Sequence, residues 1–299
     1  MLNECLEYLA LKPDGVYLDA TAGLGGHTGA IARRLAELGG SGFVLACDRD
    51  AESLEMAKAN VATGTTQHVS SRDTSSRIRF HQSLFSELGK RLTAETVSQL
   101  DGLLADLGVS RYQLTDGGRG FSLMADGPLD MRMSRDMHFG AGGTAADIVN
   151  FESEKELADL IFRLGEERRS RRIARAIVRA RPIKTTGQLA KLIEEVVPRT
   201  EKIHPATRTF MALRIAVNHE QEELDALLES IPRLVKPGGR AVIVTFMSLE
   251  DRKVKQSFQA LAKAGRAIIL TRHVVRPAEE EVRNNPPSRS AKLRALELL

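Results

Sequence analysis

The stretch V-Y-L-D-A-T-A-G-L-G-G-H-T-G at Val16–Gly29 decides the fold. Its first residues are β-branched, aromatic or aliphatic, and they predict a strand that stops at Asp19. Four glycines follow, and a helix-like segment then runs over Ala30–Leu38. The stretch therefore predicts a strand, a glycine-rich turn and a helix, in that order.

The glycine-rich turn has two interpretations. Glycine is needed where φ is positive or where a ligand approaches the backbone, and amides that open a helix favour a negatively charged group. The spacing departs from the dinucleotide pattern G-x-G-x-x-G, because the sixth position from Gly23 is Thr28 and Gly29 comes one place late. The turn is thus either ordinary turn chemistry or a cradle for a nucleotide-like cofactor.

Composition indicates a globular protein. The 299 residues are 42% hydrophobic, which is enough for one large domain or two of ordinary size. No apolar run approaches the ~20 residues of a membrane span, and the first residues lack the features of a signal peptide, so a cytoplasmic protein is expected. Cys5 and Cys47 form no C-x-x-C pair and the seven histidines show no H-x-x-x-H spacing, so no metal site is expected.

Further strands follow the first at intervals typical of an α/β protein. We predict them at Gly42–Cys47, Ile78–His81, Leu100–Leu107, Arg240–Phe246, Ala267–Thr271 and Ser290–Leu296. A short helix over Leu2–Leu9, a loop over Ala62–Arg77 and a long amphipathic helix over Phe210–Leu234 complete the pattern. The last strand alternates apolar and polar residues and has no crossover helix of its own, which favours an antiparallel strand near the sheet edge. The prediction is a doubly wound sheet with a helical insertion after the fourth strand.

Two side chains at strand ends are candidates for ligand binding. Asp48 closes the second strand, where βαβ nucleotide sites hold ribose hydroxyls. The alternative role, a cap for the following helix, fits Asp50 better. Phe85 follows the third strand and could cover a flat ring, although an aromatic residue there also suits the core.

The insertion carries the basic residues. Between Arg163 and Lys184 there are nine lysines and arginines but two acids. Four of these arginines have the spacing of one helix face: Arg168, Arg172, Arg175 and Arg179. Such a face is either simply solvated or a contact surface for a polyanion.

The predicted strands, the antiparallel last strand and a P-G-G turn before the fifth strand resemble a class I S-adenosylmethionine-dependent methyltransferase. Longer blocks are similar to the bacterial 16S ribosomal RNA cytosine N4-methyltransferase family. These blocks are D-A-T-A-G-L-G-G-H at Asp19–His27, D-L-G-V-S at Asp106–Ser110, R-G-F-S-L-M-A-D-G-P-L-D-M-R-M at Arg119–Met133, G-E-E-R at Gly165–Arg168, H-P-A-T-R-T-F at His204–Phe210, S-L-E-D-R at Ser248–Arg252 and N-P-P-S-R-S-A-K-L-R at Asn285–Arg294.

This resemblance implies methyl transfer from S-adenosylmethionine to N4 of cytosine 1402 in the decoding centre of the small ribosomal subunit. It implies a seven-stranded methyltransferase domain over 1–112 and 210–299 and an inserted all-α, RNA-binding domain over 113–209. It also implies a cytoplasmic enzyme, with a homodimer among the assemblies to be expected.

The resemblance further implies a set of cofactor contacts: Gly25, Gly26, His27, Asp48, Phe85, Asp106 and Gln113. The arginine face of the insertion would contact RNA. Cytosine N4 is a poor nucleophile, so an acceptor must hold one of its hydrogens during transfer. Either Asp106 or a backbone carbonyl of its turn accepts that hydrogen, or Asp106 contacts the cofactor alone.

Three departures from the family pattern bear on activity. The family's histidine-containing segment upstream of Met1 is missing, so its RNA contact is expected to be lost or supplied elsewhere. Met247 stands where histidine is common, and Arg111-Tyr112 replaces a small residue and a proline. Two other functions stay open at this point: a nicotinamide-dependent oxidoreductase on the same sheet, and an RNA-binding assembly factor that has lost the chemistry.

Overall fold

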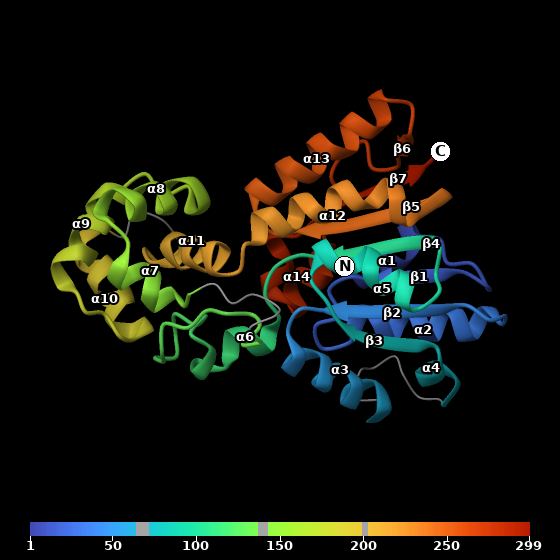
Figure 1. Ribbon diagram of the computed structural model, residues 1–299, viewed down its shortest axis with the longest axis horizontal. Helices are drawn as coiled ribbons and strands as arrows, with labels where there is room; N and C mark the ends of the chain where they lie inside the picture. Colours follow the sequence, from blue (N-terminus) through green and yellow to red (C-terminus); the bar gives the residue numbers. More distant parts are fainter. Residues whose placement is uncertain (64–71, 137–142, 199–202) are drawn as a thin grey trace. The chain divides into compact units, whose positions relative to one another are not determined.

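The protein, seen in a computed structural model, is described over residues 1–63, 72–136, 143–198 and 203–299. The chain divides into two compact units (Figure 1). Unit 1 comprises Met1–Gly108 and Glu222–Leu299, and unit 2 comprises Val109–Gln221. The predicted insertion, 113–209, ends earlier than unit 2, because the helix over Thr207–Val217 crosses that predicted end and contacts two other helices of unit 2.

Unit 1 is built on one seven-stranded sheet with the order β3-β2-β1-β4-β5-β7-β6. Strand β7 is antiparallel to both of its neighbours, and the pairs among β1 to β5 are parallel. The strands are β1 (Val16–Asp19), β2 (Phe43–Asp48), β3 (Ile78–Gln82), β4 (Leu100–Asp106), β5 (Val235–Thr245), β6 (Ala267–Ile269) and β7 (Lys292–Leu298). The predicted doubly wound sheet with an antiparallel last strand is confirmed.

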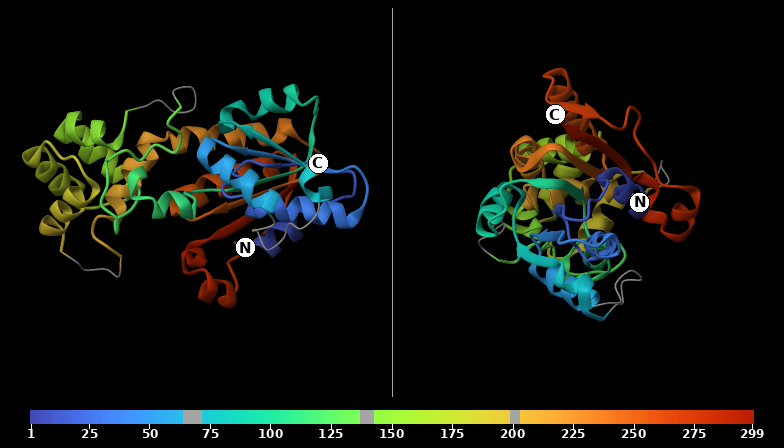
Figure 2. Two further views of the ribbon diagram at one scale, coloured as in Figure 1. Left: turned by 90° about the horizontal axis from the view of Figure 1, so that it is seen from below. Right: turned by 90° about the vertical axis from the view of Figure 1, so that its right-hand side faces the viewer.

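Helices cover both faces of this sheet, because alternate residues of its strands enter two different cores (Figures 1 and 2). In β4, Leu103 belongs to the core on one face of the sheet, and Leu104 belongs to the core on the other face. The helices are α1 (Leu2–Leu9), α2 (Gly26–Leu38), α3 (Ala51–Thr63), α4 (Arg72–Ser76), α5 (Leu88–Ala94), α12 (Glu220–Leu234), α13 (Ser248–Lys263) and α14 (Glu279–Asn284). Two 3₁₀ turns, η1 (Phe85–Glu87) and η4 (Pro286–Ser290), join them.

Unit 2 is helical and has a hydrophobic core of its own. Its elements are α6 (Arg111–Thr115), η2 (Gly117–Arg119), α7 (Ala145–Phe151), α8 (Glu154–Gly165), α9 (Ser170–Ala180), α10 (Thr186–Val196) and α11 (Thr207–Val217). Capping boxes begin two of these helices, with Ser153 at the start of α8 and Thr185 at the start of α10. In the described ranges of either unit, no helix has the length and apolar character needed to cross a bilayer.

The prediction of a single helix over Phe210–Leu234 was wrong, because α11 ends at Val217 and α12 begins at Glu220. The Asn218 side chain accepts a hydrogen bond from the Met133 amide at 2.7 Å and donates to the Met131 carbonyl at 2.7 Å. These tertiary bonds fix the end of α11, and His219 then takes a positive φ of 49°. The periodicity of apolar residues along one helix does not depend on such a distant partner, so it could not predict where α11 ends.

Two boundaries near turns also differ from the predictions. The P-G-G turn lies inside β5, as an irregularity between the pairs Leu100–Val235 and Gly102–Arg240. A Cβ on Gly239 would lie 2.9 Å from the Lys236 carbonyl oxygen, so this bulge requires glycine. The predicted loop over Ala62–Arg77 contains the helix α4, and its residues 64–71 lie outside the described ranges.

Candidate active site

Three aspartates end three neighbouring parallel strands at the same edge of the sheet. Asp19 closes β1, Asp48 closes β2 and Asp106 closes β4, and β1 lies between the other two. The carboxyl ends of parallel strands meet at one edge, where α/β proteins bind ligands. The structure thus brings two of the predicted site residues, Asp48 and Asp106, to the same place.

The glycine-rich turn leaves β1 beside these carboxylates. Gly23 and Gly25 have φ values of 51° and 88°, in the left-handed region that favours glycine. Helix α2 begins at Gly26, four residues before the predicted start at Ala30, because glycines mask a helix in a propensity pattern. A Cβ built on Gly26 has no protein atom within 4 Å, so this position borders open space.

Asp48 holds the turn and keeps acceptor capacity. Its Oδ2 accepts from the Gly23 amide at 2.8 Å, and its Oδ1 accepts from the Asp50 amide at 2.9 Å. Burial raises the pKa of Asp48 to about 6. Asp50 takes the capping role, because it accepts from the Glu52 amide and the Ser53 hydroxyl in the first turn of α3.

Asp106 and His27 face one another. Asp106 Oδ2 lies 3.7 Å from His27 Nδ1, and the two side chains are 30% and 18% exposed. In the described structure, neither Asp106 Oδ1 nor His27 Nε2 has a hydrogen-bond partner. Burial raises the pKa of Asp106 to about 7 and lowers that of His27. Buried polar atoms without partners are rare, so these two atoms suit a bound polar ligand.

Asp19 is a site-forming residue that sequence reasoning missed. It is fully buried, accepts from the Thr28 hydroxyl at 2.6 Å and accepts from the Thr21 amide at 3.1 Å. Thr21 Oγ1 in turn accepts from the Asp106 amide at 2.7 Å. Asp19 therefore ties the glycine-rich turn to α2 and, through Thr21, to the end of β4. The block D-A-T at Asp19–Thr21 could have indicated this role, because Asp and Thr side chains often form hydrogen bonds with nearby backbone groups.

The other two predicted cofactor contacts have structural roles of their own. Phe85, in η1, is partly buried and packs against the sheet core that α5 and α12 share. Gln113 belongs to unit 2, where its Oε1 accepts from the Ser110 amide at 2.9 Å in the capping box of α6. A cofactor contact by either residue stays a prediction.

The arginine face is shorter than predicted. Arg172, Arg175 and Arg179 lie exposed on α9, whereas Arg168 lies exposed in the turn before it. Glu167 holds that turn out of the helix, because its buried carboxylate accepts from the Arg169 amide at 2.8 Å. The opposite side of α9 is buried through its apolar residues Ile173, Ala174 and Ile177.

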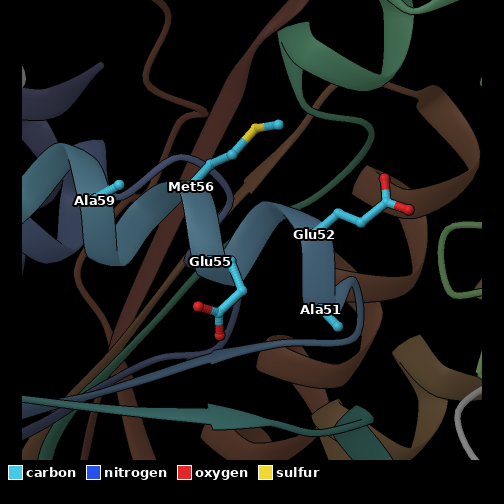
Figure 3. A pocket seen from close by; sticks show the side chains of 5 residues that line it. All are labelled: Ala51, Glu52, Glu55, Met56 and Ala59. Carbon is cyan, nitrogen blue, oxygen red and sulfur yellow. The ribbon is translucent and has the colours of Figure 1, made fainter.

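A shallow pocket lies along one side of α3 (Figure 3). Its lining residues come from that helix alone: Ala51, Glu52, Glu55, Met56 and Ala59. None of the five is a predicted site residue. The described ranges hold no group of three or more His, Cys, Asp or Glu side chains suited to a metal ion.

Comparison with known proteins gives one consistent result. The model of the MraW methylase family matches residues 1–299. Ribosomal RNA small subunit methyltransferase H of Solibacter usitatus is 56% identical over 298 residues, which cover 100% of this chain and 98% of that protein. The protein of the same name from Acidobacterium capsulatum is 48% identical over 299 residues, with 99% and 96% covered. An rRNA methylase structure from Streptococcus thermophilus aligns at 12% identity, covering 99% of this chain and 95% of that chain, and its TM-score of 0.42 is too low to carry an argument.

Proposed function

Because the chain belongs to the MraW methylase family, we propose that it methylates N4 of cytosine 1402 in 16S rRNA of the small ribosomal subunit. The observation that carries the proposal is the family match over all 299 residues, together with relatives of matching length named for small-subunit rRNA methylation. Membership of a methylase family excludes the nicotinamide oxidoreductase. Ribosomal subunits are cytoplasmic, so the same proposal places the enzyme in the cytoplasm.

The carboxyl edge of the unit 1 sheet fits S-adenosylmethionine. The Asp48 carboxylate would accept from the ribose hydroxyls, as an acid at the end of β2 does in nucleotide sites. Gly26, whose Cβ would meet open space, lets a ligand approach the backbone. The unpartnered Nε2 of His27 would contact the cofactor's polar end. Phe85 beside the adenine and Gln113 as a further contact remain part of the proposal.

The reaction needs an acceptor for an N4 hydrogen. S-adenosylmethionine supplies an electrophilic methyl group on a sulfonium. The lone pair of cytosine N4 is delocalised into the ring, so a group must hold its hydrogen while the nitrogen becomes pyramidal. We assign this role to Asp106, because its carboxylate ends β4 at the edge where the cofactor would bind and its side chain is 30% exposed. The remaining acceleration would come from positioning the base in line with the methyl group.

The exposed arginines of α9 would bind the RNA backbone. The target base must leave its stack, at a cost of roughly a few kcal/mol that backbone contacts have to offset. Arg172 and Arg179 are exposed on a helix whose other side is buried, so their guanidinium groups can reach phosphates without disturbing the core. Unit 2 is thus proposed as the RNA-binding part of the enzyme.

The test of function is direct. The protein and S-adenosylmethionine are incubated with small subunits that lack this modification, and the rRNA nucleosides are analysed by mass spectrometry. We expect N4-methylcytidine that maps to the decoding centre. Cofactor binding without this product would contradict the proposal and favour a binding factor.

The role of Asp106 needs a separate variant. We expect Asp106→Ala to bind S-adenosylmethionine, by calorimetry, with an affinity near that of the wild type and to transfer no methyl group. A loss of cofactor binding would instead assign Asp106 to the cofactor alone. Asp48→Ala is the matched comparison, since its expected defect is in cofactor affinity.

A further inference from the structure

An aromatic side chain stands in solvent at the end of α7. Phe151 is 81% exposed, although it is the last residue of a helix whose Ala145 and Val149 are fully buried in the core of unit 2. A single exposed apolar residue needs no explanation by itself. The surroundings of Phe151 are unusual in two respects: its backbone is anchored on both sides, and the anchoring segment directly follows the arginine-bearing helix α9.

Both sequence neighbours of Phe151 are fixed to the segment that follows α9. The Asn150 side chain donates to the Ile183 carbonyl and accepts from the Ile183 amide, each at 2.8 Å. On the other side, Arg181 donates to the Glu152 carbonyl at 2.5 Å and to the Val149 carbonyl at 2.8 Å. The ring of Phe151 is therefore presented from a rigid backbone, which lowers the entropy cost of a contact.

The charges around this ring favour an anionic chain. Arg179 is exposed in the last turn of α9, which packs against α7, and Arg181 follows it. Of the four acids within five residues of Phe151, Asp147 and Glu156 belong to the capping boxes of α7 and α8, Glu154 lies 3.3 Å from Arg175, and Glu152 directly follows the ring. A flat apolar ring beside arginines is the arrangement by which proteins bind unpaired nucleotides.

We propose that Phe151 is a stacking residue for an unpaired base of the substrate RNA, with Arg179 on the adjoining phosphate. This inference rests on the proposed function and adds a positioning residue to it. Single-stranded RNA is recognised mainly by stacking of splayed bases on aromatic rings, and a base next to a flipped target has lost a stacking neighbour. Stacking on the Phe151 ring would recover part of the lost stacking energy and hold the RNA strand in place.

The expected effect is large enough to measure. Base–aromatic stacking is worth about 1–3 kcal/mol per base, which corresponds to a loss of roughly 5- to 150-fold in kcat/KM for the small subunit in Phe151→Ala. The KM for S-adenosylmethionine should stay unchanged, and Phe151→Tyr should restore activity to within about 2-fold, because the ring is kept. Since no charge is removed, the dependence of kcat/KM on salt should keep its slope in Phe151→Ala and become shallower in Arg179→Ala.

Phe162 provides the matched control. Among the residues of unit 2 that the structure describes, it is the other strongly exposed phenylalanine, at 57%, but its neighbours one helical turn away, Asp159 and Glu166, are acidic. Phe162→Ala should leave kcat/KM unchanged. The chain contains no tryptophan, so F151W and F162W each introduce a single reporter. Added subunits should quench the emission of F151W well beyond that of F162W at the same concentrations.

Unchanged kinetics in Phe151→Ala, or equal quenching of the two reporters, would overturn the proposal. Sedimentation of the free protein distinguishes another occupant, because a dimer that dissociates in Phe151→Ala would show that a second copy covers this ring. The wild-type methylation assay runs beside these variants. Failure of the wild type would count against the proposed function, whereas failure of the variants alone would count against the stacking role.

Discussion

At the scale of single residues, three aspartates in equivalent positions differ because of their partners. Asp19 is fully buried, and its two carboxylate oxygens accept from Thr21 of the turn and from Thr28 of α2. Asp48 holds two backbone amides and keeps further acceptor capacity. Asp106 retains an oxygen without a partner in the described ranges. Strand ends could be predicted from sequence, but this division of roles could not, because the threonine partners of Asp19 are placed by the folded turn and by helix α2.

The raised pKa of Asp106 makes a prediction for stability. A carboxyl whose pKa is raised on folding, from 3.8 to about 7, binds its proton more tightly in the folded chain, so its stabilising effect is present below pH 4 and lost as the pH rises through 7. Asp106→Asn carries no charge. Its free energy of unfolding, relative to that of the wild type, should therefore rise by about 1 to 3 kcal/mol between pH 4 and pH 8, after allowance for solvent screening. Urea denaturation of the ligand-free proteins measures this difference, and a constant difference would contradict it.

A substitution at Gly26 can distinguish an effect on folding from an effect on cofactor binding. A Cβ at Gly26 meets no protein atom within 4 Å, so Gly26→Ala should fold normally and gain up to about 1 kcal/mol from helix propensity. The same methyl group would occupy the space proposed for the cofactor, and we expect at least a tenfold loss of S-adenosylmethionine affinity by calorimetry. Gly89→Ala, within α5, is the control, because its nearest contact is an ordinary 3.9 Å. Equal affinities in the two variants would argue against a cofactor at Gly26.

At the scale of elements, helix ends that depend on adjacent residues could be predicted from the sequence, whereas ends that depend on distant partners could not. The capping boxes at Ser153 and Thr185 each involve only four consecutive residues, so both helix starts could be predicted from the sequence. The end of α11 depends on Asn218, whose partners lie in a loop more than eighty residues away in the chain. The family blocks S-L-E-D-R and K-L-R also meet only in space, where Arg294 Nε donates to Asp251 Oδ1 at 2.6 Å. No periodicity within one segment contains that information.

Helix α9 gives a prediction that distinguishes two of its arginines. Arg175 Nε lies 3.3 Å from Glu154 Oε1, whereas within the described ranges Arg172 forms no ion pair. Arg172→Ala should reduce the log–log salt slope of small-subunit binding by about 0.7 to 0.9 for one lost phosphate contact. Arg175→Ala should reduce it less, because Glu154 already competes for that guanidinium. Filter binding between 50 and 200 mM salt, about the range where such slopes are resolved, provides the measurement; an unchanged slope in Arg172→Ala would remove α9 from the proposed RNA surface.

At the scale of the whole molecule, each unit has a core of its own. Leu103 is fully buried in the sheet core of unit 1, and Ile177 is fully buried in the helical core of unit 2. Truncation of either side chain to alanine should cost about 2–5 kcal/mol in the unit that holds it. Calorimetry should show two transitions, with Leu103→Ala lowering one and Ile177→Ala lowering the other. S-adenosylhomocysteine should raise the transition that Leu103→Ala lowers, because a ligand stabilises the unit that binds it. A single transition shifted by both variants would show that the cores unfold together.

The position of the insertion also governs the order in which the fold can form during synthesis. In unit 1, Asp106 of β4 pairs with Val244 of β5, yet all of unit 2 is translated between them. Unit 2 is one continuous segment, so its local helix contacts can form while β4 still presents an unpaired edge. An open edge of this kind invites pairing with other chains. The nascent protein is therefore most prone to aggregation after β4 has emerged and before β5 closes the sheet.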